Sequence, residues 1–143
     1  MAKLSLSKSR SIIRAALAKG KELGLKPLSV AVLDAGGHLL AFEREDGASI
    51  LRPEIAQGKA FGAVAVGVGS RWLNAQAESR PHFLEGLSNV SGGKIVPVPG
   101  GVLVKNARGE ILGAIGITGD TSDNDETCAV AGIEAAGFTA DAG

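Results

Sequence analysis

Two charged residues near the middle of the chain have types and spacing that could do chemistry. Asp46 ends a predicted strand and Lys59 lies in the predicted helix that follows, so a short connection could bring carboxylate and ammonium together. A partly buried lysine beside a carboxylate could bind an anion or act as an acid. The same two residues could instead form a structural ion pair that fixes the helix on the strand.

Arg44 stands two residues before Asp46 and should share its face of the sheet, because side chains alternate along a strand. With Lys59 it could hold a carboxylate, a group that arginine binds well in bidentate fashion. A solvated strand residue is an equally good interpretation of Arg44.

The two histidines offer imidazole, a common metal ligand. His38 follows a Gly-Gly pair, where a polar turn residue is the simpler explanation. His82 follows Pro81 in a segment predicted to be irregular, and loop positions more often carry function.

Glycines punctuate the last third of the chain. Gly100 and Gly101 leave bare backbone that could present amides to a ligand oxygen, or form a bulge or a contact between subunits. Gly113, Gly116 and Gly119 interrupt an otherwise apolar strand. A glycine within a strand has no side chain to pack and costs backbone entropy. Its repeated use therefore suggests that another chain, a facing helix or a ligand comes close to the backbone.

Four carboxylates gather at the start of the last predicted helix: Asp120, Asp123, Asp125 and Glu126. Helix capping and the helix dipole account for most of this cluster, and a divalent ion is the weaker explanation. No H-x-x-H or C-x-x-C spacing indicates zinc, so no metal site is predicted. The lone Cys128 is expected to be a small core residue.

The composition fits one domain over residues 1–143, with 45% hydrophobic and only 3% aromatic residues. Fifteen basic and fifteen acidic residues give no basic stripe, which argues against nucleic acid as a partner. The N-terminus has no apolar signal-peptide core, and the run AFGAVAVGVG is too short to span a bilayer. With a single cysteine, the chain is predicted to be cytoplasmic.

The periodicity and turn residues predict an α/β (α+β) fold in the order α-β-β-α-α-β-β-β-α. Hairpin connections dominate, which indicates an antiparallel sheet of about five strands flanked by helices. Helices are predicted at 7–23, 53–66 and 122–136, a β-hairpin around 34–37, two short helices or a helix and a loop within 71–89, and strands at 94–98, 101–106 and 110–118.

Three segments together resemble the GlcG/HbpS-like family: LSVAVLDAGGHLLAFEREDGA, AQGKAFGA and GGVLVKNARGEILGAIGITGDTSDNDETCAVAGI. That family includes heme-binding proteins, glycolate-operon proteins and the C-terminal domain of PduO-type corrinoid adenosyltransferases. The resemblance implies an antiparallel five-stranded sheet and homo-oligomers, which are octamers in some members. It also implies binding of heme, or a role beside small-molecule catabolism.

Residues and resemblance together predict a cytosolic, oligomeric small-molecule-binding protein, with heme or a related tetrapyrrole as ligand. The predicted pocket combines Arg44, Asp46, Lys59, Gly100 and Gly101, and His82 or His38 could supply an axial heme ligand. One alternative is an enzyme acting on a small carboxylate or aromatic-catabolism intermediate, with Asp46 and Lys59 as acid/base groups and Arg44 as clamp. Another is a non-catalytic accessory or assembly module.

Overall fold

The structure is a computed structural model that describes residues 3–143. Five helices and five strands follow one another along this part of the chain. They are α1 (Leu6–Glu22), β1 (Ser29–Asp34), β2 (Leu39–Arg44), α2 (Arg52–Val66), α3 (Ser70–Ser79), α4 (Pro81–Val90), β3 (Gly101–Lys105), β4 (Ile111–Thr118), α5 (Ser122–Ala135) and β5 (Thr139–Asp141).

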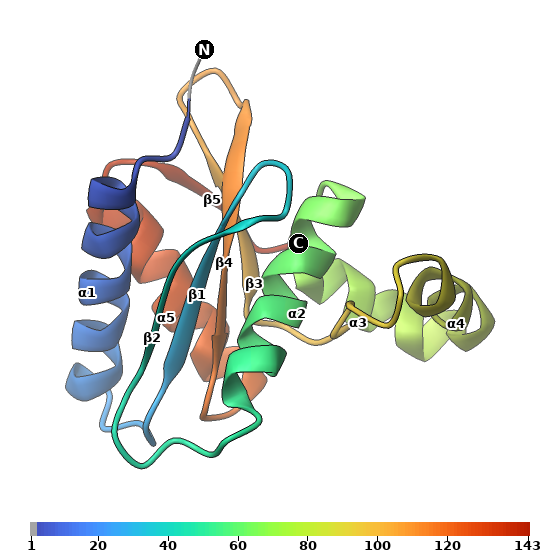
Figure 1. Ribbon diagram of the computed structural model, residues 1–143, viewed down its shortest axis with the longest axis horizontal. Coiled ribbons are helices and arrows are strands. Elements are labelled where there is room, and N and C mark those ends of the chain that lie inside the picture. Colours follow the sequence, from blue (N-terminus) through green and yellow to red (C-terminus); the bar gives the residue numbers. More distant parts are fainter. Residues whose placement is uncertain (1–2) are drawn as a thin grey trace.

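The five strands form one sheet in the order β2-β1-β4-β3-β5, and every neighbouring pair is antiparallel. Helices α1 and α5 pack side by side on one face, and α2 covers the other (Figure 1). Helices α3 and α4 pack on each other and extend away from the sheet beyond α2 (Figure 1). The predicted class and the five-stranded antiparallel sheet with flanking helices are confirmed.

The two faces of the sheet carry side chains of different size. Val30 and Val32 of β1 belong to the large aliphatic core under α1 and α5. The strand residues that alternate with these point to the other face and toward α2. Among them, Ala31, Gly116 and Gly101 form a row across three strands. Because successive strand residues point to opposite faces, one sheet buries a bulky layer on one side and a thin layer on the other.

The thin layer lets the backbone of α2 lie directly on the strands. A Cβ added to Gly116 would collide with the carbonyl oxygen of Ala56, and one added to Gly101 would collide with the backbone of Lys59. Of the three explanations for the strand glycines, the facing helix is therefore correct at Gly116, and the same helix covers Gly101. Any side chain there would force α2 off the sheet.

The strand predicted at 94–98 is wrong. Within residues 3–143 this segment pairs with no strand; the N–H of Val96 donates to the carbonyl of Gly58 in α2, at 3.2 Å. Pro97 and Pro99 lack the N–H groups that a sheet ladder needs. The fifth strand is β5 instead, which pairs with β3 at the C-terminal end of the described chain.

The helix ends agree closely with the sequence signals. Ser5 caps α1 by accepting from the N–H of Lys8, and Thr121 caps α5 by accepting from the N–H of Asn124. Pro81 divides the 71–89 region into two short helices, α3 and α4. No helix within residues 3–143 is long and apolar enough to cross a membrane.

Candidate functional site

Lys59 is buried in an ion pair, but its partner is Asp125 and not Asp46. The Lys59 Nζ atom donates to Asp125 Oδ2 at 3.1 Å and to the carbonyl of Ile117 at 2.9 Å. The two charged side chains are only 3% and 1% exposed. Burial lowers the pKa of Lys59 and raises the pKa of Asp125, while the attraction between the two charges opposes both shifts. This ion pair ties α2 to α5 past the end of β4.

Asp46 lies in the turn after β2 and is exposed. It lines a surface hollow together with Arg44 and Lys21, although it lies past the end of β2 and not on the strand. The structure does not bring Asp46 and Lys59 together, and the acid/base pair required by the enzyme alternative is not formed. Lys59 does belong to a structural ion pair, but the predicted partner Asp46 is wrong, because the structure pairs Lys59 with Asp125.

Every carboxylate of the acidic cluster has a partner inside the chain. Asp120 accepts from the side-chain amide of Asn124 and from the N–H groups of Lys26 and Thr121; these hydrogen bonds lower the pKa of Asp120 to about 2. Asp123 and Glu126 both pair with Arg71 of α3 and raise the pKa of its guanidinium. Within residues 3–143, no three His, Cys, Asp or Glu side chains gather as a metal site requires.

Gly100 and Gly101 lie against Lys59, and all three residues are buried. A Cβ on Gly100 would lie 2.7 Å from the carbonyl oxygen of Ile117 and 3.0 Å from Lys59 Nζ. Gly100 also has a φ of +121°, which a side chain would make costly. The N–H of Gly101 donates to the hydroxyl of Ser70 at 2.8 Å, so this amide is already occupied. The glycine pair is a tight packing contact.

The two histidines lie apart from these residues and from each other. His38 lies in the exposed β1–β2 turn, where its Nδ1 is 3.2 Å from Asp34 Oδ1. The N–H of His38 also donates to that carboxylate and lowers the pKa of Asp34. His82 is exposed in the first turn of α4, on the part of the molecule that extends beyond α2 (Figure 1).

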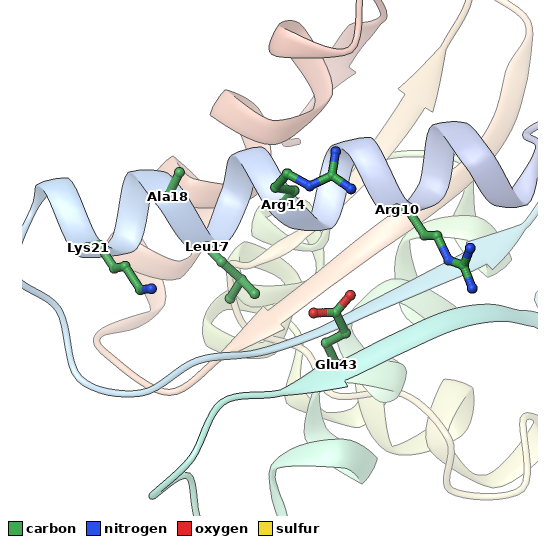
Figure 2. A pocket seen from close by; sticks show the side chains of 6 residues that line it. All are labelled: Arg10, Arg14, Leu17, Ala18, Lys21 and Glu43. Carbon is green, nitrogen blue, oxygen red and sulfur yellow. The ribbon is translucent and has the colours of Figure 1, made fainter.

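A hollow of about 580 Å³ lies between α1 and the edge strand β2, away from the predicted pocket. We call it the α1–β2 groove. Its walls carry three cations, two apolar side chains and one carboxylate: Arg10, Arg14, Lys21, Leu17, Ala18 and Glu43. Figure 2 shows Glu43 pointing from β2 toward the helix, between Leu17 and Arg10. Its volume lies within the roughly 300–1,000 Å³ of ordinary ligand pockets.

The cations of the groove share it with one carboxylate, Glu43, but do not lie within ion-pair distance of it. Within residues 3–143, Arg10, Arg14 and Lys21 make no ion pair, whereas Lys19 on the same helix pairs with Glu22 at 3.5 Å. Unpaired cations beside an apolar surface suit a ligand that combines an apolar body with carboxylates.

The sequence contains a signal for this groove that composition alone does not reveal. Arg10, Arg14, Leu17 and Lys21 recur at intervals of four, three and four residues, which places them along one stripe of a helix. The stripe faces β2, which contributes Glu43 to the groove. The hollow shared by Arg44 and Asp46 adjoins the groove, because Lys21 lines both.

The sequence matches a known protein family over most of its length. A family model described as haem degrading protein HbpS-like matches residues 4–134. The chain therefore belongs to the HbpS-like family. An uncharacterized 15.0 kDa protein from the dhaT-dhaS intergenic region of Citrobacter freundii is 28% identical over 134 residues, which cover 94% of this chain and 92% of that one. Corrinoid adenosyltransferase PduO of the same organism is 30% identical over 132 residues, but these are only 38% of its length.

Solved structures agree with this assignment. The structure described as a PduOC:heme complex superposes with a TM-score of 0.85 at 28% identity, covering 96% of this chain and 97% of the other. HbpS superposes with a TM-score of 0.81 at 30% identity, over 94% and 90% of the two chains. The fold and the family resemblance predicted from the sequence are both confirmed.

Proposed function

We propose that this protein binds heme or a related tetrapyrrole in the α1–β2 groove. The single observation that carries the proposal is the set of unpaired cations, Arg10, Arg14 and Lys21, around the apolar side chains of Leu17 and Ala18. The similarity to a protein solved as a heme complex supports the choice of ligand.

The residues of the groove fit the periphery of a heme. Its propionates are carboxylates, and the guanidinium groups of Arg10 and Arg14 and the ammonium of Lys21 would bind them. Leu17 and Ala18 would contact the apolar ring. When bound, heme supplies an iron that takes an axial ligand and can exchange electrons.

Neither histidine lines the groove within one chain. His38 lines a separate hollow beside Lys3 and Leu4, and His82 belongs to α4. The proposal therefore rests on charge and apolar contact, and assigns no axial ligand to His38 or His82.

Titration with hemin, followed by the Soret band, tests the proposal. Replacing Arg10, Arg14 and Lys21 together by Gln should weaken hemin binding by about tenfold or more. Loss of a single charge-assisted hydrogen bond to a propionate would already account for about tenfold. The control replaces Lys8, Lys26 and Arg108 by Gln, which changes the net charge equally and should leave the affinity within about twofold. Equal losses in the two triple variants, or no saturable Soret shift in the parent protein, would contradict the proposal.

We also propose that the protein is a homo-oligomer, as the resemblance to octameric family members implies. Large apolar side chains stand exposed on one chain, Ile50 at 87% and Val90 at 84%. Such residues gathered at an interface would be covered by a second copy. Light scattering at several protein concentrations tests this, and a monomer at all of them would contradict it.

The proposed compartment is the cytoplasm. The only cysteine, Cys128, is buried as a free thiol, and burial raises its pKa to about 11. A free thiol suits a reducing environment. Cell fractionation tests this assignment.

A further inference from the structure

A second hollow, of about 570 Å³, lies on the opposite face of the sheet from the α1–β2 groove. We call it the Phe61 groove. Its apolar surface comes from Leu33 at the end of β1, Ile55 and Phe61 of α2, and Val96 of the segment after α4. None of these residues takes part in the function proposed above.

The wall of the Phe61 groove is fixed by a glycine contact. A Cβ on Gly58 would lie 2.5 Å from Val96 Cγ2 and 3.1 Å from the carbonyl oxygen of Lys94. Because Gly58 has no side chain, the Lys94–Val96 segment lies directly on α2 and is held there by the hydrogen bond from the Val96 N–H. The groove is thus bounded by a helix and a fixed extended segment. Such preformed boundaries reduce the entropy lost on binding.

The groove holds one cation without a protein partner. Lys94 Nζ lies 5.6 Å from the centroid of the Phe61 ring, and no carboxylate within residues 3–143 pairs with it. Glu54, the acidic residue of the lining, lies in the first turn of α2, where the helix dipole already favours a negative charge. The cation that the lining offers to a ligand carboxylate is the ammonium of Lys94, which stands over the Phe61 ring.

We propose that the Phe61 groove is a binding site for a small aromatic monocarboxylate. The aromatic body packs on Phe61, Ile55 and Val96, and the carboxylate pairs with Lys94. This site is separate from the α1–β2 groove and does not depend on heme binding there.

Calorimetric titration with 1-naphthoate as probe tests the site, with NMR amide shifts locating it. The parent protein should bind 1-naphthoate saturably, with the largest shifts at residues 54–61 and 93–96. Lys94→Gln should weaken binding by about tenfold, whereas Lys26→Gln, which removes an exposed lysine elsewhere, should change it less than about twofold. Leu51→Trp, which adds bulk to an exposed side chain at the groove, should block binding without disturbing the fold.

The outcomes separate this proposal from heme binding. The triple variant at Arg10, Arg14 and Lys21 should keep its affinity for 1-naphthoate. No saturable binding, equal effects of Lys94→Gln and Lys26→Gln, or shifts centred on α1 would overturn the proposal. The amide shifts of the groove could instead change when the protein is diluted and stay constant when 1-naphthoate is added. That result would show that a second copy covers the groove, and it would equally overturn the proposal.

Discussion

The surroundings of Lys59 and the α1–β2 groove both contain cations close to backbone or apolar surface, yet they differ in one respect. Lys59 has an acceptor for its charge inside the fold, since Asp125 and the carbonyl of Ile117 lie within hydrogen-bond distance. Arg10, Arg14 and Lys21 have none within residues 3–143 and line an open hollow. We call the first region the sealed region; it comprises Lys59, Asp125, Gly100 and Gly101.

The difference separates structural charge from charge that is free to bind. A buried ion pair already satisfies its groups, and a ligand would have to break it to gain anything. An unpaired cation at an apolar groove gains a partner when a carboxylate arrives. Burial and an altered pKa alone would have favoured Lys59 as the binding site. The groove is favoured instead because its cations have no ion-pair partner, whereas Lys59 already has one.

The largest effect is expected from Lys59→Met. It leaves Asp125 buried without a counter-charge and should lower the free energy of unfolding by about 3–5 kcal/mol. Urea denaturation at pH 7 measures this loss. The double variant Lys59→Met with Asp125→Leu should recover most of it, because no buried charge is then unpaired. A loss below about 1 kcal/mol in the single variant would mean that the region is not sealed from water.

Titration of Cys128 gives the next effect, because burial, and after it the negative charge of Asp125, raise the pKa of this thiol to about 11. A raised pKa contributes stability that is present below the ordinary value of 9 and is lost as the pH rises through 11. Comparison with Cys128→Ala should therefore show the parent losing about 2–3 kcal/mol more between pH 8.5 and pH 11. Parallel pH profiles of the two proteins would argue that the thiol is accessible to water.

Gly101→Ala tests how closely α2 lies on the sheet. The added methyl group would collide with the Lys59 backbone and lie 2.8 Å from Ser70 Oγ, so we expect a loss of about 1–3 kcal/mol. The matched control is Gly86→Ala in α4, where a Cβ meets nothing within 4 Å. That change should stabilise the protein by up to about 1 kcal/mol, because alanine favours a helix. Thermal melts that shift equally for both variants would contradict the packing described above.

Asp46→Asn should have the smallest effect. Asp46 is exposed and does not contact Lys59, so its loss should change the free energy of unfolding by less than about 0.5 kcal/mol. A loss comparable to that of Lys59→Met, measured by the same urea denaturation, would restore the predicted partnership of the two residues.

Most helices and strands could be predicted from the sequence because their signals are local. The glycine pair at 36–37 marked the hairpin, Pro81 divided α3 from α4, and Ser5 and Thr121 marked helix starts. The fifth strand was missed because β5 has only three residues and its pairing with β3 is decided across the whole sheet.

The site was harder to predict because its contacts are remote in sequence. Four carboxylates near residue 120 and Asp46 were all available to Lys59, and only the placement of α5 selects Asp125, 66 residues away. The groove stripe on α1 was readable as a pattern, but helical spacing cannot tell a solvated face from one that borders a hollow. That distinction depends on where β2 lies.

The position of the iron in crystals grown with hemin tests the central claim most directly. Anomalous scattering measured at the iron edge should place the iron in the α1–β2 groove, against Leu17 and Ala18 and within reach of the Arg10, Arg14 and Lys21 side chains through the propionates. An iron peak beside Gly100 and Lys59, or beside His38 or His82 and outside the groove, would contradict the account.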